Sequence, residues 1–373
     1  MQTRSTLLAA GTFVGTVIGV GVFGLPYLAS RMGLVPLVIL FVILTPLVII
    51  IHLRFAGVVE RSQESKRIPG YVAQYLGPRW GRLSRVVSCL GLLGSLLAYL
   101  VIGGTFLSVM AQPLGEIPLP LATLIFFLLG SALIVRGSRS VAWVDLIMIA
   151  AFFVIVGIFF FLAFPKLDMS LFRLIHWPDA PAGYGVTLFA LWGLSLVPET
   201  VELAGRGTMR AQRVLRVGIV SAALIYVLFT IMVLGVTGQE TTPDALTGFL
   251  RNFSPWVIVL GGLLGILTTF TSYIALGVTL KKTLQFDIRL TERLAILCTL
   301  AFPLGLYMLG LKNFLDVLGL TGAFLLGFEG ILVLLVSDRS RDALHASPFR
   351  LGTLVLVSAL FIGMLVELWS FVR

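Results

Sequence analysis

The sequence is dominated by long apolar runs, each about as long as the stretch of helix that crosses a bilayer. Eleven runs are separated by short segments with charged residues or proline, and they cover residues 6–28, 34–53, 86–110, 119–135, 141–164, 184–205, 217–235, 256–280, 294–311, 314–336 and 351–371. None of them alternates apolar and polar residues, as the strands of a membrane β-barrel do. We therefore expect an all-α polytopic membrane protein with about eleven transmembrane helices.

The low content of charged residues supports this class. Only 12% of the residues are charged, whereas a soluble globular domain carries roughly 25%, which excludes soluble enzymes and nucleic-acid-binding proteins. The two cysteines, Cys89 and Cys298, lie in apolar runs, and the histidines, His52, His176 and His345, lie far apart. Neither arrangement fits a metal site or a disulfide framework, and we expect no cofactor apart from a coupling ion.

The basic residues are distributed unevenly between the two sides that the spans define. If the N-terminus is cytoplasmic, all but six of the 27 Lys and Arg residues fall in cytoplasmic segments. The six exceptions are Arg31, Lys166, Arg173, Arg251, Lys312 and Arg373. Because Lys and Arg accumulate on the cytoplasmic side, we predict a multi-pass protein of the plasma (inner) membrane with a cytoplasmic N-terminus. An odd number of spans then places the C-terminus outside.

The longest external connection leaves five spans before it and six after it. It covers residues 165–183 and contains Pro165, Pro178 and Pro181. Because five is an odd number, two five-helix repeats would lie in the membrane with opposite orientations. We predict a first repeat at 1–164, an external linker at 165–183, an inverted repeat at 184–336, and a cytoplasmic loop with the eleventh helix at 337–373.

The longest cytoplasmic connection, residues 58–85, contains two pairs of helix-breaking residues. They are Pro69 with Gly70, and Gly77 with Pro78. Breaks on both sides of a short segment indicate a short interfacial helix between them. A solvated loop is the alternative.

The first span contains more helix-weakening residues than helix packing requires. They are Gly11, Gly15, Gly19, Gly21, Gly24 and Pro26. The first three are four residues apart and form a small-residue face that suits helix packing, but the last three weaken the helix at mid-span. Residues 19–24 also match GxGxxG, yet a dinucleotide site needs a preceding strand and an acidic residue about 20 positions on, where Ile39 lies. A broken helix is the better interpretation.

A break at mid-span indicates a binding site, because irregular backbone at membrane depth is tolerated only where it lines a cavity or protein. The half-helix that starts near Gly21 presents N–H groups and a positive dipole end to a carboxylate. Carbonyl groups near Ile18 are available to a cation. Residues 189–199 of the sixth span also contain glycine and proline at mid-span, at Gly193 and Pro198. Breaks at corresponding positions of two halves favour a transporter.

These features resemble the amino acid-polyamine-organocation superfamily, whose members unwind the first and sixth helices of a leucine-transporter-type fold around an amino acid. The resemblance rests on residues 10–26 (AGTFVGTVIGVGVFGLP), residues 194–199 and the helix count, and it covers nearly the whole chain. It is closest to the hydroxy and aromatic amino acid permeases and the amino acid/auxin permeases. It implies a 5+5 inverted repeat with broken helices 1 and 6 plus one C-terminal helix, and secondary active uptake of a neutral amino acid.

The resemblance also implies a cation site between the first break and the eighth helix. The positions that match the sodium ligands of relatives are the carbonyls of Gly15, Ile18 and Thr268 and the hydroxyls of Thr271 and Ser272. Alternatively, these hydroxyls bond back to carbonyls of their own helix. The fifth span lacks the lysine that some proton-coupled relatives place here, which favours Na⁺. Many aromatic amino acid permeases use H⁺, however, so the coupling ion stays open.

Ionisable residues in the spans form a second set of candidates, because charges in the membrane are costly and often functional. Four carboxylates fall in the cytoplasmic half: Asp145, Glu199, Glu202 and Glu329. Proton binding or an inner gate is the functional interpretation, with Glu199 preferred because it follows the second break. Structural ion pairs are the alternative. Arg4 and Asp287 lie at the cytoplasmic ends of the first and eighth spans and are candidates for an inner-gate pair.

No charge falls within either break, which favours a neutral amino acid with an apolar or aromatic side chain as the substrate. The candidate substrate-binding residues are Ile18, Gly19, Gly21, Val22, Phe23, Ser95, Tyr99, Phe189, Ala190 and Trp192. We predict cation-coupled symport by alternating access, by a monomer or weak oligomer in the lipid bilayer. A receptor that binds an amino acid without transport is the alternative. An enzyme is disfavoured because no serine or cysteine nucleophile has a nearby histidine.

Overall fold

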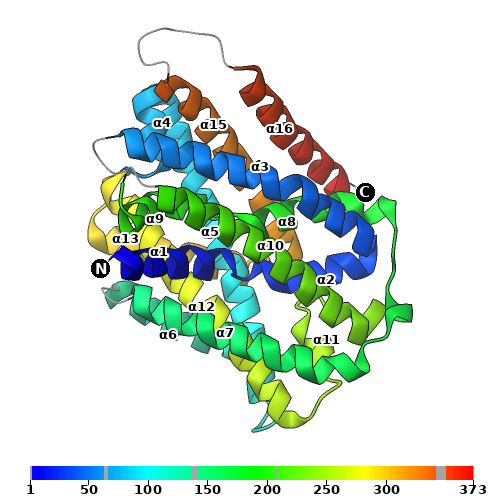
Figure 1. Cartoon of the computed structure of the whole chain (residues 1–373). Helices are drawn as coiled ribbons and strands as arrows, with labels where there is room; N and C mark the ends of the chain where they lie inside the picture. The colour runs from blue at the N-terminus through cyan, green and yellow to red at the C-terminus, as the bar shows by residue number, and fades with distance from the viewer. Residues whose placement is uncertain (1, 63–65, 137–140, 207–208, 342–349, 373) are drawn as a thin grey trace.

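The structure is a computed structural model of the chain and describes residues 2–62, 66–136, 141–206, 209–341 and 350–372. Side chains are described for these residues except 2–5 and 141–149. All regular secondary structure in the described ranges is helical (Figure 1). This confirms the predicted all-α class.

The first half of the chain forms seven helices. They are α1 (Gln2–Val17), α2 (Gly21–Met32), α3 (Leu34–Arg61), α4 (Ile68–Leu76), α5 (Pro78–Ala111), α6 (Leu119–Arg136) and α7 (Val141–Ala163). Three short 3-10 turns follow in the proline-rich external connection, at Phe164–Lys166 (η1), Met169–Leu171 (η2) and Trp177–Ala182 (η3).

The second half contains the remaining helices. They are α8 (Gly183–Leu191), the 3-10 turn η4 (Leu194–Leu196), α9 (Val197–Ala204), α10 (Met209–Thr237), the turn η5 (Gly238–Glu240), α11 (Leu246–Leu250), α12 (Pro255–Phe286), α13 (Glu292–Met308), α14 (Phe314–Leu320), the π-helical turn η6 (Thr321–Leu326), α15 (Gly327–Arg341) and α16 (Leu351–Val372).

Most of the predicted spans are visible as long apolar helices. Eight spans in the described ranges are long and apolar enough to cross a bilayer, and the bent pair of α1 and α2 makes a ninth. Helices α7 and α13 correspond to the other two predicted spans. Several helices run beyond the predicted bounds: α3 reaches Arg61, α5 starts at Pro78, α10 starts at Met209 and α12 reaches Phe286. An apolar run marks only the part of a helix that lies in hydrocarbon, and the helix continues into the polar region beyond it.

The first and sixth spans are both interrupted, as predicted. Helix α1 ends at Val17 and α2 starts at Gly21, with a bend of 44° between them. In the sixth span α8 ends at Leu191, the backbone is extended at Trp192, and α9 starts at Val197. Proline is tolerated in the first turn of a helix, where no intrahelical hydrogen bond is lost, and Pro198 occupies that turn of α9.

The short helix predicted in the cytoplasmic connection is α4, which packs on α5 and α15. Pro69 lies in its first turn. Gly77 follows its last residue with a φ of 94°, a conformation that favours glycine. The two helix-breaking pairs therefore delimit the helix between them, and the alternative of a solvated loop is wrong.

Helix α8 crosses the tenth span where the π-helical turn η6 widens it. A Cβ atom on Gly185 would lie 2.2 Å from the carbonyl oxygen of Gly319, and one on Gly322 would meet the carbonyl of Gly185 even more closely. Glycine at these positions lets the two backbones touch. Such small-residue contacts are the usual means of close helix packing in membranes.

The last helix, α16, packs on α15, α8 and η3. Its Glu367 is 2% exposed, and the carboxylate Oε2 accepts the N–H of Gly185 at 2.9 Å. The first N–H groups of a helix have no acceptor within it. The eleventh span therefore caps the start of the broken sixth span.

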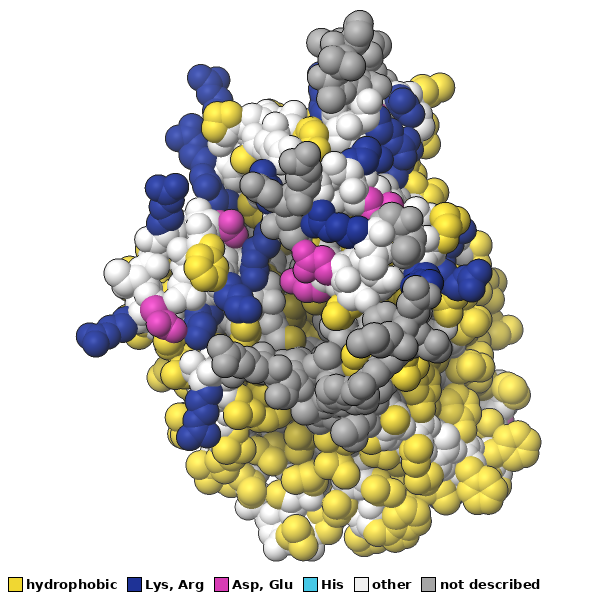
Figure 2. Space-filling view, turned by 60° about the vertical axis from the view of Figure 1, so that its left-hand side comes forward, with side chains coloured by type: hydrophobic (Ala, Val, Ile, Leu, Met, Phe, Trp, Pro, Cys, Tyr) yellow, Lys and Arg dark blue, Asp and Glu magenta, His cyan; other side chains and the backbone are white. Residues whose placement is uncertain are grey.

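The surface divides into a basic end and an apolar body. Lys and Arg side chains gather over one end of the molecule, and hydrophobic side chains cover the part below them (Figure 2). The N-terminal end of α1 and the C-terminal end of α16 lie at opposite ends of the bundle (Figure 1). A hollow opens in the basic end between acidic and basic side chains (Figure 2).

Candidate functional site

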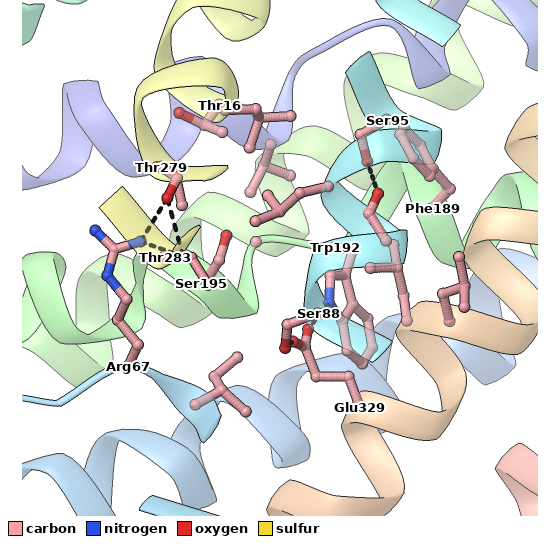
Figure 3. A pocket seen from close by; sticks show the side chains of 18 of the residues that line it. Thr16, Arg67, Ser88, Ser95, Phe189, Trp192, Ser195, Thr279, Thr283 and Glu329 are labelled. Carbon is pink, nitrogen blue, oxygen red and sulfur yellow. Dashed lines mark hydrogen bonds between the residues drawn. The ribbon is translucent and has the colours of Figure 1, made fainter. Parts of the chain in front are cut away.

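A cavity of about 240 Å³ lies between the two broken helices. Its inner wall includes Gly19 and Gly21 of the first break, and Ala190 and Gly193 of the second. Aromatic and hydroxyl side chains complete this wall: Ser95 and Tyr99 from α5, Phe189 from α8, and Trp192 from the second break (Figure 3). Backbone from both breaks and aromatic rings therefore face one space.

The two breaks are in direct contact beside this cavity. A Cβ atom on Gly21 would lie 2.6 Å from both Cα and Cβ of Ala190. A Cβ atom on Gly193 would lie 2.7 Å from a methyl group of Val17. Real Cβ atoms do not approach other atoms this closely. A larger residue at Gly21 would displace the backbone of Ala190, and one at Gly193 would displace the side chain of Val17.

The first break leaves backbone groups available to a ligand. The amide of Gly19 donates to the carbonyl of Val17 at 2.7 Å, and the amide of Phe23 donates to Val20 at 3.1 Å. Among the hydrogen bonds of the described residues, none has the amide of Gly21 as donor. As the first residue of α2, Gly21 has no intrahelical acceptor for its N–H, and the positive end of the α2 dipole lies there.

His52 stabilises the second break. Its Nε2 accepts the N–H of Gly193 at 3.1 Å, and its Nδ1 lies 2.8 Å from the carbonyl oxygen of Val48. This pair of contacts requires the neutral tautomer with the proton on Nδ1. Sequence reasoning considered the histidines only as metal ligands and missed this role, although a histidine inside an apolar span must have a polar partner.

Tyr226 of α10 joins the two breaks. Its buried hydroxyl lies 2.5 Å from the carbonyl oxygen of Val17 and 3.0 Å from that of Ala190. These carbonyls belong to the ends of α1 and α8, where helices lack intrahelical donors. Sequence reasoning also missed Tyr226, because nothing in its own span distinguishes it from a packing aromatic residue.

Glu329 of α15 is the most buried carboxylate on the cavity wall, at 6% exposure. It accepts hydrogen bonds from the hydroxyl of Ser88 at 2.7 Å and from the indole Nε1 of Trp192 at 3.4 Å (Figure 3). No described basic side chain forms an ion pair with it. Trp192 connects this carboxylate to the second break.

Charged residues surround the outer part of the cavity, at the start of α4 and along α9. Arg67 Nη1 donates to the carbonyl of Thr279 and to the hydroxyl of Thr283, both at 2.8 Å, and so ties α4 to α12 (Figure 3). Lys66, Glu199 and Glu202 also line the cavity, and we call the part formed by these three residues and Arg67 the mouth of the cavity.

Most of the predicted substrate-binding residues share the cavity. Gly19, Gly21, Ser95, Tyr99, Phe189, Ala190 and Trp192 line it. Ile18, Val22 and Phe23 do not, and this part of the prediction differs from the structure. They are buried instead, and the Phe23 ring packs edge-on against Phe106, with centroids 4.6 Å apart. Val22 and Phe23 lie in the first turn of α2, where their side chains point away from the cavity, and the Ile18 side chain is buried within the break itself.

The predicted cation ligands lie on α1, in the first break and on α12. Helix α1 packs chiefly on α7, α9 and α10, and two threonine hydroxyls of α12 bond within their own helix. Thr271 donates to the carbonyl of Leu267 at 3.0 Å, and Thr268 bonds back to its own helix in the same way. Ser272 is buried, at 2% exposure.

The predicted proton and gate residues fall into three groups. Glu199, Glu202 and Glu329 line the cavity. The side chains of Arg4 and Asp145 lie outside the described part of the structure. Asp287 follows the last residue of α12. Burial raises the pKa of its carboxyl, although the guanidinium groups of Arg67 and Arg85 act against the rise.

Two comparisons with known proteins agree with this architecture. A family model described as the tryptophan/tyrosine permease family matches residues 2–370. Among solved structures 165 chains match, and one is the crystal structure of MhsT in complex with L-phenylalanine, with a TM-score of 0.69 and 15% sequence identity over 99% of this chain and 97% of MhsT. No curated protein sequence matches. The structural similarity confirms the leucine-transporter-type fold.

Proposed function

Because the chain belongs to the tryptophan/tyrosine permease family, we propose that it takes up an aromatic amino acid by cation-coupled symport. Membership of this family makes the protein an amino acid transporter and not an enzyme. The aromatic substrate, the coupling and the direction are the proposal. The resemblance of the sequence to the aromatic amino acid permeases supports an aromatic substrate.

The observation that carries the proposal is the cavity enclosed by both helix breaks and by aromatic rings. The substrate carboxylate would bind the amide of Gly21 at the positive end of α2. The substrate ammonium would bind carbonyl oxygens near Ile18 and Phe189. The side chain would then lie among Tyr99, Phe189 and Trp192, which line the same space. MhsT, which shares the fold, was solved with L-phenylalanine bound.

The cavity also suggests which state of the transport cycle the structure represents. It extends from the breaks to Lys66, Arg67 and Glu202, at the basic end of the molecule. Because basic ends of membrane proteins face the cytoplasm, we interpret this state as inward-facing. Alternating access would follow from movement of the broken helices relative to the other spans. The location in the inner membrane, with the N-terminus inside, belongs to the same proposal.

The coupling ion is either H⁺ at Glu329 or Na⁺ at the eighth-span hydroxyls. Glu329 lies on the cavity wall and contacts the second break through Trp192, so its protonation would change a contact at the substrate site. The hydroxyls of Thr268 and Thr271 bond back to carbonyls of their own helix in the present state, whereas Glu329 already contacts the second break. These contacts favour the proton.

The first test is thermal stabilisation of the purified protein by amino acids. A ligand that binds the folded state raises its apparent stability by about 2.7 kcal/mol at 100 times Kd. We expect tryptophan, tyrosine and phenylalanine to raise the melting temperature, with leucine and lysine as controls. Each would be tested with Na⁺ and with K⁺ at two pH values. No shift with any aromatic amino acid would overturn the proposed substrate.

The second test separates transport from binding alone. The protein in liposomes should accumulate labelled tryptophan when a pH gradient, acidic outside, is imposed. A Na⁺ gradient at constant pH is the matched alternative and would drive uptake if the eighth span binds sodium. Binding without uptake under either gradient would favour a receptor.

A further inference from the structure

A second hollow, separate from the substrate cavity, lies between the inner half of the broken first span and α10. It has a volume of about 460 Å³. Helix α1 contributes Thr6, Ala10 and Val14, which are four residues apart and therefore lie on one helix face. Helix α10 contributes Val214 and Val217 opposite them. We call this hollow the α1–α10 groove.

The groove changes character along its length. The two helices pack on each other, and at the inner end Gly218 closes the groove, since a Cβ atom there would lie 2.8 Å from the Phe13 ring. At the other end, in the first turns of α10, Arg210 and Arg213 line it. None of the described lining residues is acidic. The groove is therefore apolar at depth and basic at its outer end.

The outer side of the groove continues into the apolar surface of α10. Val217 is 57% exposed, and Leu224, two turns further along, is also exposed. Such a surface faces acyl chains in a membrane protein. Seven residues separate Arg210 from Val217, about 10 Å along a helix. A headgroup held at the arginines would thus leave an acyl chain lying along the valines.

We propose that the α1–α10 groove binds one anionic phospholipid, with the headgroup phosphate at Arg213 and Arg210 and an acyl chain along Val214 and Val217. Basic pockets between transmembrane helices on the cytoplasmic side bind anionic headgroups for the same electrostatic reason. The lipid would hold α1, the inner half of the broken first span, against α10. This inference does not depend on which amino acid the cavity takes.

Native mass spectrometry of the full-length protein with added phosphatidylglycerol or phosphatidylcholine of the same acyl chains tests the site. We expect tighter retention of phosphatidylglycerol. Arg213→Gln should weaken this retention about fivefold, because each basic residue near an anionic membrane surface contributes about 1 kcal/mol of attraction. Arg82→Gln, in the exposed first turns of α5, is the matched control and should leave retention unchanged.

A second variant separates the groove from diffuse attraction to the basic end. Val217→Trp keeps every charge but fills the groove, and it should reduce retention of phosphatidylglycerol. Equal retention of both lipids, or an equal effect of Arg82→Gln and Arg213→Gln, would overturn the site. Full retention by Val217→Trp would place the lipid outside the groove.

Discussion

Single atoms decide which residues fit around the two breaks. Gly19, Gly21 and Gly193 each face an atom that a Cβ would overlap, but the neighbours differ. Gly21 faces the backbone of Ala190, whereas Gly19 faces the tip of a side chain, the hydroxyl of Tyr99. The sequence motifs predicted the glycines but not their partners, because the partners come from α1, α5 and α8, each far away along the chain from the glycine that it contacts.

The contact between Gly19 and Tyr99 leads to a rescue prediction. In Gly19→Ala the new Cβ would lie 2.4 Å from the Tyr99 hydroxyl, while the ring carbon behind it is at 3.5 Å. Overpacking of this kind costs about 1–3 kcal/mol. We expect Gly19→Ala to lower the melting temperature and Tyr99→Phe, added to it, to restore most of the loss. A double variant no more stable than Gly19→Ala would contradict this contact.

The second residue-scale prediction concerns the acceptor at the second break. His52→Leu leaves the amide of Gly193 without its partner and should destabilise the protein by about 1–3 kcal/mol. His52→Gln is the control, because a glutamine oxygen can take the place of Nε2. Thermal unfolding of the three proteins in detergent measures both effects. Equal losses in the two variants would mean that ring packing, not the hydrogen bond, matters.

Glu329 gives a prediction about coupling. Glu329→Gln keeps the size and the hydrogen-bonding oxygen but cannot change charge, so uptake in liposomes should lose its dependence on external acid. Glu199→Gln, at the cavity mouth, is the comparison, because Glu199 was the carboxylate that sequence reasoning preferred. If only Glu199→Gln flattened the pH dependence of uptake, the proton site would be Glu199 on α9 and not Glu329.

At the scale of elements, the broken helices could be predicted and the π-helical turn could not. Glycine and proline at mid-span weaken a helix by their own chemistry. The breaks at residues 18–21 and 192–198 can therefore be predicted from the local sequence alone. Residues 321–326 contain one glycine and otherwise suit an ordinary helix. Their widening goes with the packing of Gly185 against Gly319 and Gly322, which only the folded chain contains.

The hydrogen bond by which Glu367 of α16 caps the start of α8 can be tested by substitution. Glu367→Leu removes the acceptor of the Gly185 amide and should destabilise the protein by about 1–3 kcal/mol. Glu367→Gln retains a carbonyl oxygen at the same place and should cost less. Both are compared by thermal unfolding, with Leu368→Ala, on the exposed side of α16, as the control. A larger loss in Glu367→Gln than in Glu367→Leu would exclude the cap.

At the scale of the whole molecule, the apolar runs were sufficient to predict the class and the order of the helices. The packing partners of each helix could not be predicted from the sequence. Membrane helices are apolar on most sides, so their sequences do not show which face packs against which neighbouring helix. The cavity therefore contains seven of the ten predicted substrate-binding residues and the predicted Glu329. The roles of His52 and Tyr226 depend on packing that the sequence does not contain.

The orientation of the whole molecule yields a labelling prediction. In a background of Cys89→Ser and Cys298→Ser, Ser254→Cys before α12 and Thr291→Cys after it are both exposed positions. A membrane-impermeant maleimide should label Ser254→Cys in intact cells, and Thr291→Cys only after permeabilisation. The reverse pattern would invert the proposed topology, and with it the inward-facing interpretation.

The hydrogen bond between Gly185 and Glu367 has a consequence for biosynthesis. The two residues are 182 positions apart, and a ribosome adds about 5–20 residues per second. For about 10–35 s the start of α8 is therefore already made while its acceptor has not been translated. A helix made much later in synthesis therefore supplies the acceptor for the start of a helix at the centre of the protein. A message truncated before codon 367 would encode both breaks. In its product, however, the amide of Gly185 in α8 would lack its acceptor, the carboxylate of Glu367.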